Sequence, residues 1–238
     1  MVYLNSLQRI TRILSGLVLS VALAACASAK PPSSAAPTVW ALRDVARIGG
    51  LATEVVGAPK PAGPGAESAI VFDGKADGVL VPVNPIAGWS AFTIEVRFKP
   101  DGTGGEEQRF LHLEDSLKHR VLMETRVTPD KQWSLDTFLF QDAGHRLTLL
   151  DRARLHPTDR WYWVALVYDG KTMAHYVNGA LELEGEVAFT PMSAGRTSIG
   201  VRQNLVSWFK GAIGEVRFTP DALPAASLKT EGDSALRR

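Results

Sequence analysis

The segment from Trp161 to Leu183 (WYWVALVYDGKTMAHYVNGALEL) constrains the fold more than any other part of the chain. It holds two runs of strand-forming residues, Trp161–Tyr168 and Thr172–Val177, and each run is followed by a turn dipeptide, Asp169-Gly170 or Asn178-Gly179. Such dipeptides favour type I′ turns, in which both central residues have positive φ, and they mark β-hairpins. The segment therefore predicts three antiparallel strands in a meander.

Alternation of apolar and polar residues predicts further strands on both sides of this meander. The clearest is Phe92–Lys99 (FTIEVRFK), where every second residue is apolar and the others are Thr, Glu, Arg and Lys. Similar runs are Thr53–Val56, Ala69–Phe72, Val79–Val83, Arg109–Leu113, Arg120–Val127, Trp133–Phe140, Leu147–Leu150, Thr197–Arg202 and Ala212–Phe218. Many short strands separated by Gly-rich turns predict an all-β fold, a two-sheet antiparallel jelly-roll sandwich, with an up-and-down barrel as the alternative.

Composition excludes several classes of function. The chain has 26 Lys and Arg against 25 Asp and Glu and shows no basic stripe, so it gives no electrostatic basis for binding nucleic acid. It has one cysteine, Cys26, which rules out an intrachain disulfide and a cysteine-based zinc site. Ser198 does not lie in a Gly-x-Ser-x-Gly motif, and the five histidines are scattered, so nucleophilic catalysis has no support.

The N-terminus has the pattern of a secretory signal. Arg9 and Arg12 precede an apolar run, Ile13–Ala25, which is shorter than the roughly 20 residues that span a bilayer. The sequence Leu-Ala-Ala-Cys then follows, with the only cysteine at its end, and it resembles the lipobox of bacterial lipoproteins. This resemblance implies a lipid on Cys26 that anchors the protein to a membrane, and Ala27 after it favours the outer membrane.

These features predict a simple domain organisation. Residues 1–25 are expected to be a lipoprotein signal peptide, and residues 26–38 the lipidated cysteine with a flexible tether rich in Ala, Ser and Pro. One jelly-roll domain is expected over residues 39–223, followed by a C-terminal tail over residues 224–238. The protein is expected in the bacterial cell envelope, facing the periplasm or the surface.

Several segments together carry a family resemblance. They are SAIVFDGKADGVLVP (68–82), FTIEVRFKP (92–100), WVALVYDG with YVNG (163–179), SIGVR (198–202) and FKGAIGEVRFTPDAL (209–223). Their order and spacing resemble the bacterial LamG-like branch of the concanavalin A-like jelly rolls. The resemblance implies two antiparallel sheets, one curved to give a concave face, and a function in binding glycans or extracellular proteins. Some relatives act on polysaccharides, and the fold alone does not decide between these functions.

Candidate ligand residues follow from the strand alternation. Polar side chains that point away from the core would form a face of alternating acids and arginines, if their strands are neighbours in one sheet. A sugar site combines such hydrogen-bonding groups with an aromatic ring, for which Trp163, Trp133 and Trp208 are candidates. A solvated face of cross-strand ion pairs is the structural alternative. The predicted ligand residues are Glu95, Arg97, His112, Glu124, Arg126, Asp136, Trp163, Arg202 and Asn204.

Three functions remain open at this stage. The first is a binding module for a glycan or an envelope protein. The second is a polysaccharide-active enzyme, a lyase or a glycoside hydrolase, with Glu95, Glu124 and His112 as catalytic groups. The Glu-x-Asp-x-x-Glu motif of the related endo-glucanases is absent. The third is a structural envelope protein without a cleft.

No metal ligands can be assigned from the sequence. The resemblance implies that calcium is possible at the rim of the sandwich, where Asp73–Asp77 and Asp101–Glu107 are acidic loops. The alternative is that these are ordinary turn aspartates, whose side chains accept hydrogen bonds from nearby backbone N–H groups.

Overall fold

A computed structural model describes residues 36–64 and 68–233. The expected signal peptide, the lipidation site Cys26 and most of the expected tether lie outside these residues. The regular structure of the described chain is almost entirely strand, with a short 3-10 helix, η2 (Ala225–Ser227), and a second 3-10 segment at residues 231–233. Within the described part of the chain, no helix has the length and apolar character needed to cross a membrane.

The first sheet, here called sheet I, contains the meander that opened the sequence analysis. Its strands are ordered β16 (Ala180–Glu186), β15 (Thr172–Val177), β14 (Tyr162–Tyr168), β8 (Phe92–Pro100), β18 (Lys210–Thr219), β6 (Ala69–Asp73) and β5 (Lys60–Ala62), with β1 (Thr38–Ala41) also paired to β18. All pairs are antiparallel. The sequence did not predict β1.

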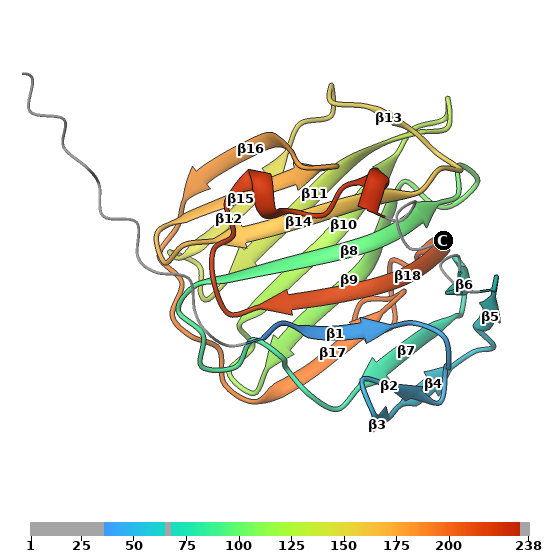
Figure 1. Cartoon of the computed structure of the whole chain (residues 1–238), viewed down its shortest axis with the longest axis horizontal. Coiled ribbons are helices and arrows are strands. Elements are labelled where there is room, and N and C mark those ends of the chain that lie inside the picture. The colour runs from blue at the N-terminus through green and yellow to red at the C-terminus, as the bar shows by residue number, and fades with distance from the viewer. Residues whose placement is uncertain (1–35, 65–67, 234–238) are drawn as a thin grey trace, which may run out of the picture. The chain divides into compact units, whose positions relative to one another are not determined.

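The second sheet, sheet II, lies behind sheet I in Figure 1. Its strands are ordered β12 (Arg146–Leu150), β11 (Gln132–Phe140), β10 (Arg120–Val127), β9 (Glu107–Asp115), β17 (Gly195–Ile199), β7 (Gly78–Val81) and β4 (Glu54–Val56), with β13 (His156–Pro157) also paired to β11. A separate small hairpin is formed by β2 (Arg47–Ile48) and β3 (Leu51–Ala52). The two antiparallel sheets confirm the predicted jelly-roll sandwich.

The two predicted hairpin turns form by different means. At Asn178-Gly179 both residues have positive φ, 48° and 80°, as a type I′ turn requires. At Asp169-Gly170 only the glycine has a positive φ, of 100°. The Asp169 carboxylate accepts the N–H groups of Lys171 and Thr172, at 2.8 and 2.7 Å, and closes that turn instead.

The core lies between the sheets and follows the predicted alternation. On β8 the residues Phe92, Ile94, Val96 and Phe98 are buried in it, and β10 and β11 contribute alternate apolar residues from the other side. The ring of Phe98 stacks on Phe110 of sheet II with centroids 4.6 Å apart, and Trp133 meets its edge at 5.1 Å. Aromatic contacts of this kind join the sheets and leave the alternate polar residues on the two outer faces.

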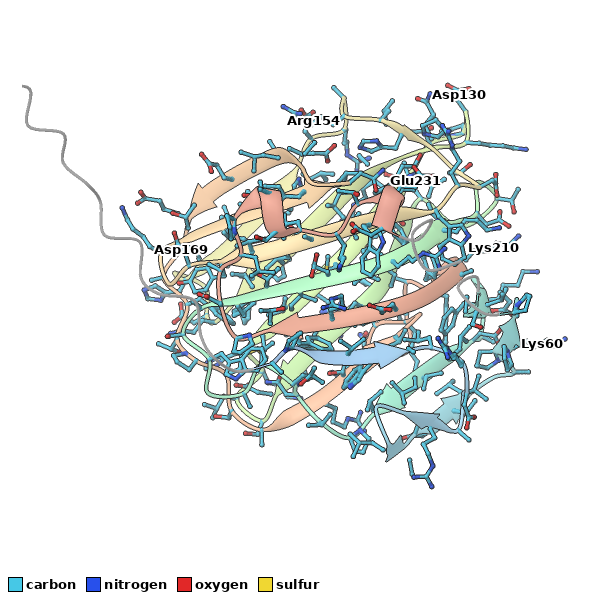
Figure 2. All side chains as sticks on the ribbon, viewed as in Figure 1. Lys60, Asp130, Arg154, Asp169, Lys210 and Glu231 are labelled. Atoms are coloured by element: carbon cyan, nitrogen blue, oxygen red, sulfur yellow. The ribbon has the colours of Figure 1, made fainter. Side chains whose placement is uncertain are left out.

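The chain beyond β18 packs against the outer face of sheet I. This segment, residues 221–233, is here called the strap, and Figure 2 labels Glu231 near its end. Leu228 of the strap is buried against Ala165 and Val167 of β14. The strap includes most of the residues expected to form a C-terminal tail. The packed structure therefore continues to residue 233 rather than ending at residue 223.

Candidate functional site

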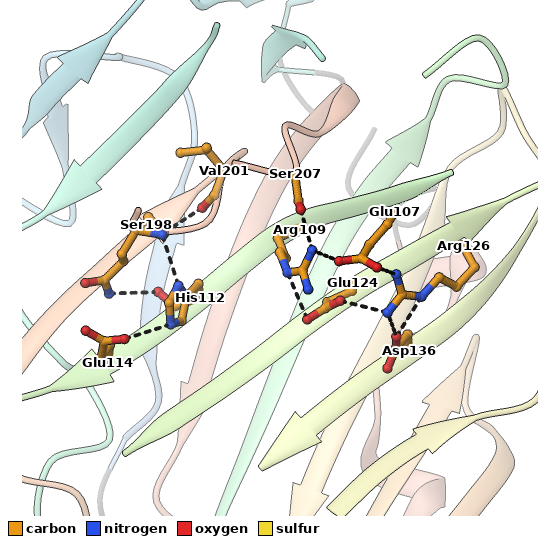
Figure 3. Close-up of polar contacts among 11 residues, drawn as sticks. Glu107, Arg109, His112, Glu114, Glu124, Arg126, Asp136, Ser198, Val201 and Ser207 are labelled. Carbon is orange, nitrogen blue, oxygen red and sulfur yellow. Dashed lines mark hydrogen bonds and ion pairs between the residues drawn. The ribbon is translucent and has the colours of Figure 1, made fainter. Parts of the chain in front are cut away.

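The outer face of sheet II carries a ladder of ion pairs across three strands. The charge ladder consists of Glu107 and Arg109 of β9, Glu124 and Arg126 of β10, and Asp136 of β11 (Figure 3). The strand register places Glu124 opposite both Arg109 and Asp136. Arg109 Nε lies 3.2 Å from Glu124 Oε1, and Arg126 Nε donates to Asp136 Oδ2 at 2.8 Å. Glu107 pairs with both arginines.

Burial gives the ladder its electrostatic character. Glu124 is 3% exposed and Asp136 1% exposed, so both carboxylates are removed from water. Burial, followed by the neighbouring charge of Asp136, raises the pKa of Glu124 to about 7. Burial also raises the pKa of Asp136, although the guanidinium of Arg126 acts in the opposite direction. A carboxyl group with a pKa near neutrality can give or take a proton, but here both Glu124 oxygens already face guanidinium groups.

An open groove of about 710 Å³ lies on the same sheet, at its β17 side. His112 of β9 and Arg120 of β10 form part of its wall, together with Arg196 of β17. Arg202 and Asn204 come from the loop after β17. The groove thus brings together three of the predicted ligand residues, His112, Arg202 and Asn204.

The loop that carries Arg202 and Asn204 is held in place by its neighbour Gln203. The Gln203 backbone N–H donates to Nδ1 of His112 at 3.1 Å, and its side-chain amide donates to the Arg196 carbonyl at 2.8 Å. Gly200 permits the turn into this loop, because it has φ of 80° and any Cβ would lie 2.2 Å from the ring of Phe72. Gly200 and Gln203 together therefore fix the position of the loop that forms one wall of the groove.

His112 is a neutral side chain in this setting. Burial, together with the positive charges of Arg202 and Arg120, lowers its pKa to about 3. Since Nδ1 accepts a hydrogen bond from Gln203, the ring proton is on Nε2. Nε2 lies 3.7 Å from Glu114 Oε2 and has no hydrogen-bond partner among the described residues.

Glu95, Arg97 and Trp163 do not join the other predicted ligand residues. The strands that carry them, β8 and β14, belong to sheet I, whereas β10 and β11 belong to sheet II. The expected single face and the pairing of Glu95 with Glu124 as catalytic groups are therefore wrong. Alternation predicted correctly that Glu95 and Arg97 point away from the core, but it does not say which strands become neighbours.

These sheet I residues are engaged in packing instead. Glu95 accepts the backbone N–H of Lys229 in the strap at 2.6 Å and lies 3.6 Å from Arg217 Nε. The guanidinium of Arg97 lies 4.0 Å from the ring centroid of Trp161. Trp163 is only 5% exposed. None of the three offers an accessible ligand surface in this structure.

The expected aromatic platform is absent from the groove, since no described residue that lines it is Trp, Tyr or Phe. Trp133 is in the core with no exposed surface. Several residues of the site were not predicted, namely Glu107, Arg109, Arg120, Arg196 and Gln203. Arg109 follows from alternation only if the bulge at Phe110, where the β9 and β10 register shifts, is known.

The acidic loops considered for calcium are built as hydrogen-bonded turns. One oxygen of Asp73 accepts the backbone N–H groups of Lys75, Ala76 and Asp77. Asp101 accepts both the N–H and the hydroxyl of Thr103. These carboxylates are occupied by hydrogen-bond donors, as turn aspartates are. Among the described residues there is no group of three or more His, Cys, Asp or Glu side chains that could hold a metal ion.

Comparison with solved structures supports the fold assignment. Domain 4 of AbnA, a GH43 extracellular arabinanase from Geobacillus stearothermophilus, in complex with arabinotriose, has a TM-score of 0.55 and 19% identity, over 85% of this chain and 88% of that one. The binding domain of botulinum neurotoxin DC in complex with SialylT has a TM-score of 0.60 and 12% identity. The match to that toxin domain covers 80% of this chain and 49% of the other.

A structure of botulinum neurotoxin type C, whose cell entry is dependent upon interaction with two ganglioside molecules, is also similar. It has a TM-score of 0.57 and 11% identity over 80% of this chain and 49% of that one. This chain thus spans about half the length of these toxin chains. At such identities the likeness concerns the fold alone. No curated protein sequence matches the chain.

A family model identifies the chain at the sequence level. The model for the Concanavalin A-like lectin/glucanases superfamily matches residues 73–229, which is more than half of the chain and extends into the strap. The two antiparallel sheets agree with this match. The protein therefore belongs to the concanavalin A-like lectin/glucanase superfamily.

Proposed function

We propose that this protein binds a glycan in the groove on the outer face of sheet II. The observation that carries the proposal is the convergence of His112, Arg202 and Asn204, from a strand and a loop about ninety residues apart, on one open groove of about 710 Å³. Glycan-binding sites use such fixed donors and acceptors to recognise hydroxyl and acidic groups. Relatives of the same fold have been solved with arabinotriose and SialylT, which supports a glycan as the ligand class.

The direct test is a glycan-array screen of the purified protein, with and without calcium. We expect binding to a defined set of glycans without shortening of the bound chains. Asn204→Ala should weaken binding of the best glycan, because Asn204 is exposed at the groove and its side-chain amide makes no hydrogen bond with a described residue, so both the oxygen and the NH2 group can meet hydroxyls. Failure to bind any glycan would overturn the proposal and leave a protein partner or a structural role.

A polysaccharide-active enzyme is the second candidate, and one observation favours it. Glu124, with a pKa raised to about 7 by burial, lies directly across from a second carboxyl group, Asp136. In this reading Glu124 would transfer the proton, which requires the guanidinium groups of Arg109 and Arg126 to move from its oxygens. Incubation of each bound glycan with wild type and Glu124→Gln decides the matter. Product formed by the wild type alone would favour the enzyme.

We also propose that the protein is anchored in the bacterial envelope by a lipid on Cys26. The proposal is supported by the Leu-Ala-Ala-Cys sequence and by the position of the only cysteine directly after the apolar run. Cys26→Ser should move the protein from the membrane fraction to the soluble fraction of a bacterial host. An unchanged membrane fraction would contradict lipidation at this residue.

A further inference from the structure

The groove carries more positive than negative charge. Its wall has four cationic side chains and two acidic ones, Lys118, Arg120, Arg196 and Arg202 against Glu114 and Asp115. Both acids are already engaged. Glu114 Oε1 lies 2.9 Å from Lys118 Nζ, and Asp115 accepts backbone N–H groups from three residues. Of the remaining arginines, Arg196 has one ion-pair partner outside the groove wall, Glu54, whose Oε2 lies 4.0 Å from its Nη1. The positive charge of the three arginines is therefore only partly compensated.

Two of these arginines, Arg120 and Arg202, form no ion pair with any described residue. The guanidinium of Arg202 forms no ion pair or side-chain hydrogen bond with any residue that the structure describes. Arg120 lies over the ring of Phe140 at 4.2 Å, and its buried Nε has no hydrogen-bond partner in the described part of the chain. Burial, and then the nearby charge of Arg202, lowers the pKa of Arg120, while Glu114, opposite it in the strand register, acts in the other direction. An anion bound near both groups would relieve this repulsion and form charge-assisted hydrogen bonds.

His112 adds a donor that is fixed in position. Its side chain is 1% exposed, and the nearest acceptor to its Nε2–H, Glu114 Oε2, lies 3.7 Å away, beyond hydrogen-bond distance. A buried donor that stays unpaired costs free energy, which a ligand oxygen would recover. Because Nδ1 is held by Gln203, the ring cannot turn to satisfy Nε2 elsewhere without losing that bond.

The groove offers no ring on which a neutral sugar could stack, since none of its described lining residues is Trp, Tyr or Phe. Neutral sugars are commonly held through their apolar faces on aromatic rings. Recognition here must come from charge and hydrogen bonds.

We propose that the groove binds the anionic group of an acidic sugar, a carboxylate or a sulfate ester, through Arg120, Arg202 and His112. This inference rests on the proposed glycan-binding function and specifies the class of glycan. Planar guanidinium groups match the oxygens of such anions.

The test is a calorimetric titration with oligosaccharides of equal length. An oligogalacturonate and its methyl ester differ only in charge, and a sulfated galactan oligosaccharide supplies the other anion. We expect the uronate, the sulfated chain, or both to bind at least about tenfold more tightly than the ester at low salt, because hydrogen bonds to charged groups are the stronger ones. The preference should shrink as salt is raised.

Two variants locate the effect. Arg202→Gln should weaken binding of the acidic chain about tenfold, while Lys171→Gln, which removes an equal charge from an exposed side chain at the edge of sheet I, should leave it unchanged. Thermal melting confirms that both variants fold. Equal binding of the uronate, the sulfated chain and the ester would overturn the inference but leave glycan binding intact. An equal loss in both variants would also overturn it. No binding of any of the three, together with an empty array, would overturn both proposals.

Discussion

The outer faces of the two sheets carry the same kinds of side chain and differ in what covers them. On sheet I the strap lies over Thr93 and Glu95, and its backbone bonds directly to both. On sheet II some of the charged side chains pair with one another, in the charge ladder, and others line the open groove. Outward-pointing polar residues on a strand can therefore form either a surface against which the chain itself packs, as on sheet I, or a surface open to a ligand, as on sheet II.

The same contrast separates two buried glutamates. Burial raises the pKa of both Glu95 and Glu124. Glu95 is bound by a backbone N–H of the strap, whereas Glu124 meets only side chains, those of Arg109 and Arg126. Side chains can change rotamer at low cost, but the strap leaves only if its packing is lost. A raised pKa alone does not distinguish the two situations.

The largest effect is expected for Glu124→Gln as a function of pH. Folded Glu124 keeps its proton up to a pKa of about 7, whereas the unfolded chain releases it near 4.5. The stability that this group contributes is complete below pH 4.5 and is lost as pH rises to 7. Glutamine does not titrate, so the variant should gain about 3 kcal/mol relative to wild type between pH 5 and pH 8.

Urea unfolding of both proteins at each pH measures this difference, and contributions from titrating groups that the two proteins share, such as His112, cancel in it. Glu186→Gln is the matched control, because Glu186 is an exposed residue at the edge of sheet I. A difference that stays constant with pH would show that Glu124 is ionised throughout.

A smaller loss is expected when the strap is loosened. Leu228→Ala removes the side chain that packs against Ala165 and Val167, and should lower the free energy of unfolding by about 2 kcal/mol. That is the low end for such a change, since the strap lies at the surface and can relax. Glycan binding should be unchanged. A large loss of affinity in a folded variant would connect the strap to the site and break the comparison of the two faces.

The smallest effect is expected for Glu95→Gln. Glutamine still accepts the Lys229 N–H, and loss of the ion pair with Arg217 is offset because a buried carboxylate is removed. We expect the free energy of unfolding to change by less than about 1 kcal/mol, with no change in glycan affinity or in any turnover. Reduced affinity with unchanged stability would mean that sheet I takes part in binding.

The architecture was largely predictable because hairpin turns and alternation act locally. Asn178-Gly179 fixes its turn by the φ values of two residues, and Phe92–Lys99 shows its buried face in its own sequence. The run Val79–Val83 was predicted slightly too long, since β7 ends at Val81, before Pro82, a residue without a backbone N–H. β1 was missed because it has only four residues, of which only Trp40 is buried, so it shows no alternation.

The site was predictable only in part, because sheet membership is not a local property. His112, Arg202 and Asn204 were correctly expected to lie near one another, while Glu95 was assigned to the wrong face. Arg120 and Arg196 lie at strand ends, where alternation carries little information about a cavity. The position of the groove depends on a loop held by Gln203, a contact that no periodicity reveals.

Hydrogen–deuterium exchange of the protein with and without its best glycan tests the central claim most directly, because it reports on both outer faces at once. Binding in the groove should slow exchange at residues 112–120 and 194–204 and leave the strap, residues 221–233, unchanged. Slowed exchange in the strap, with residues 112–120 and 194–204 unaffected, would contradict the assignment of the ligand face to sheet II.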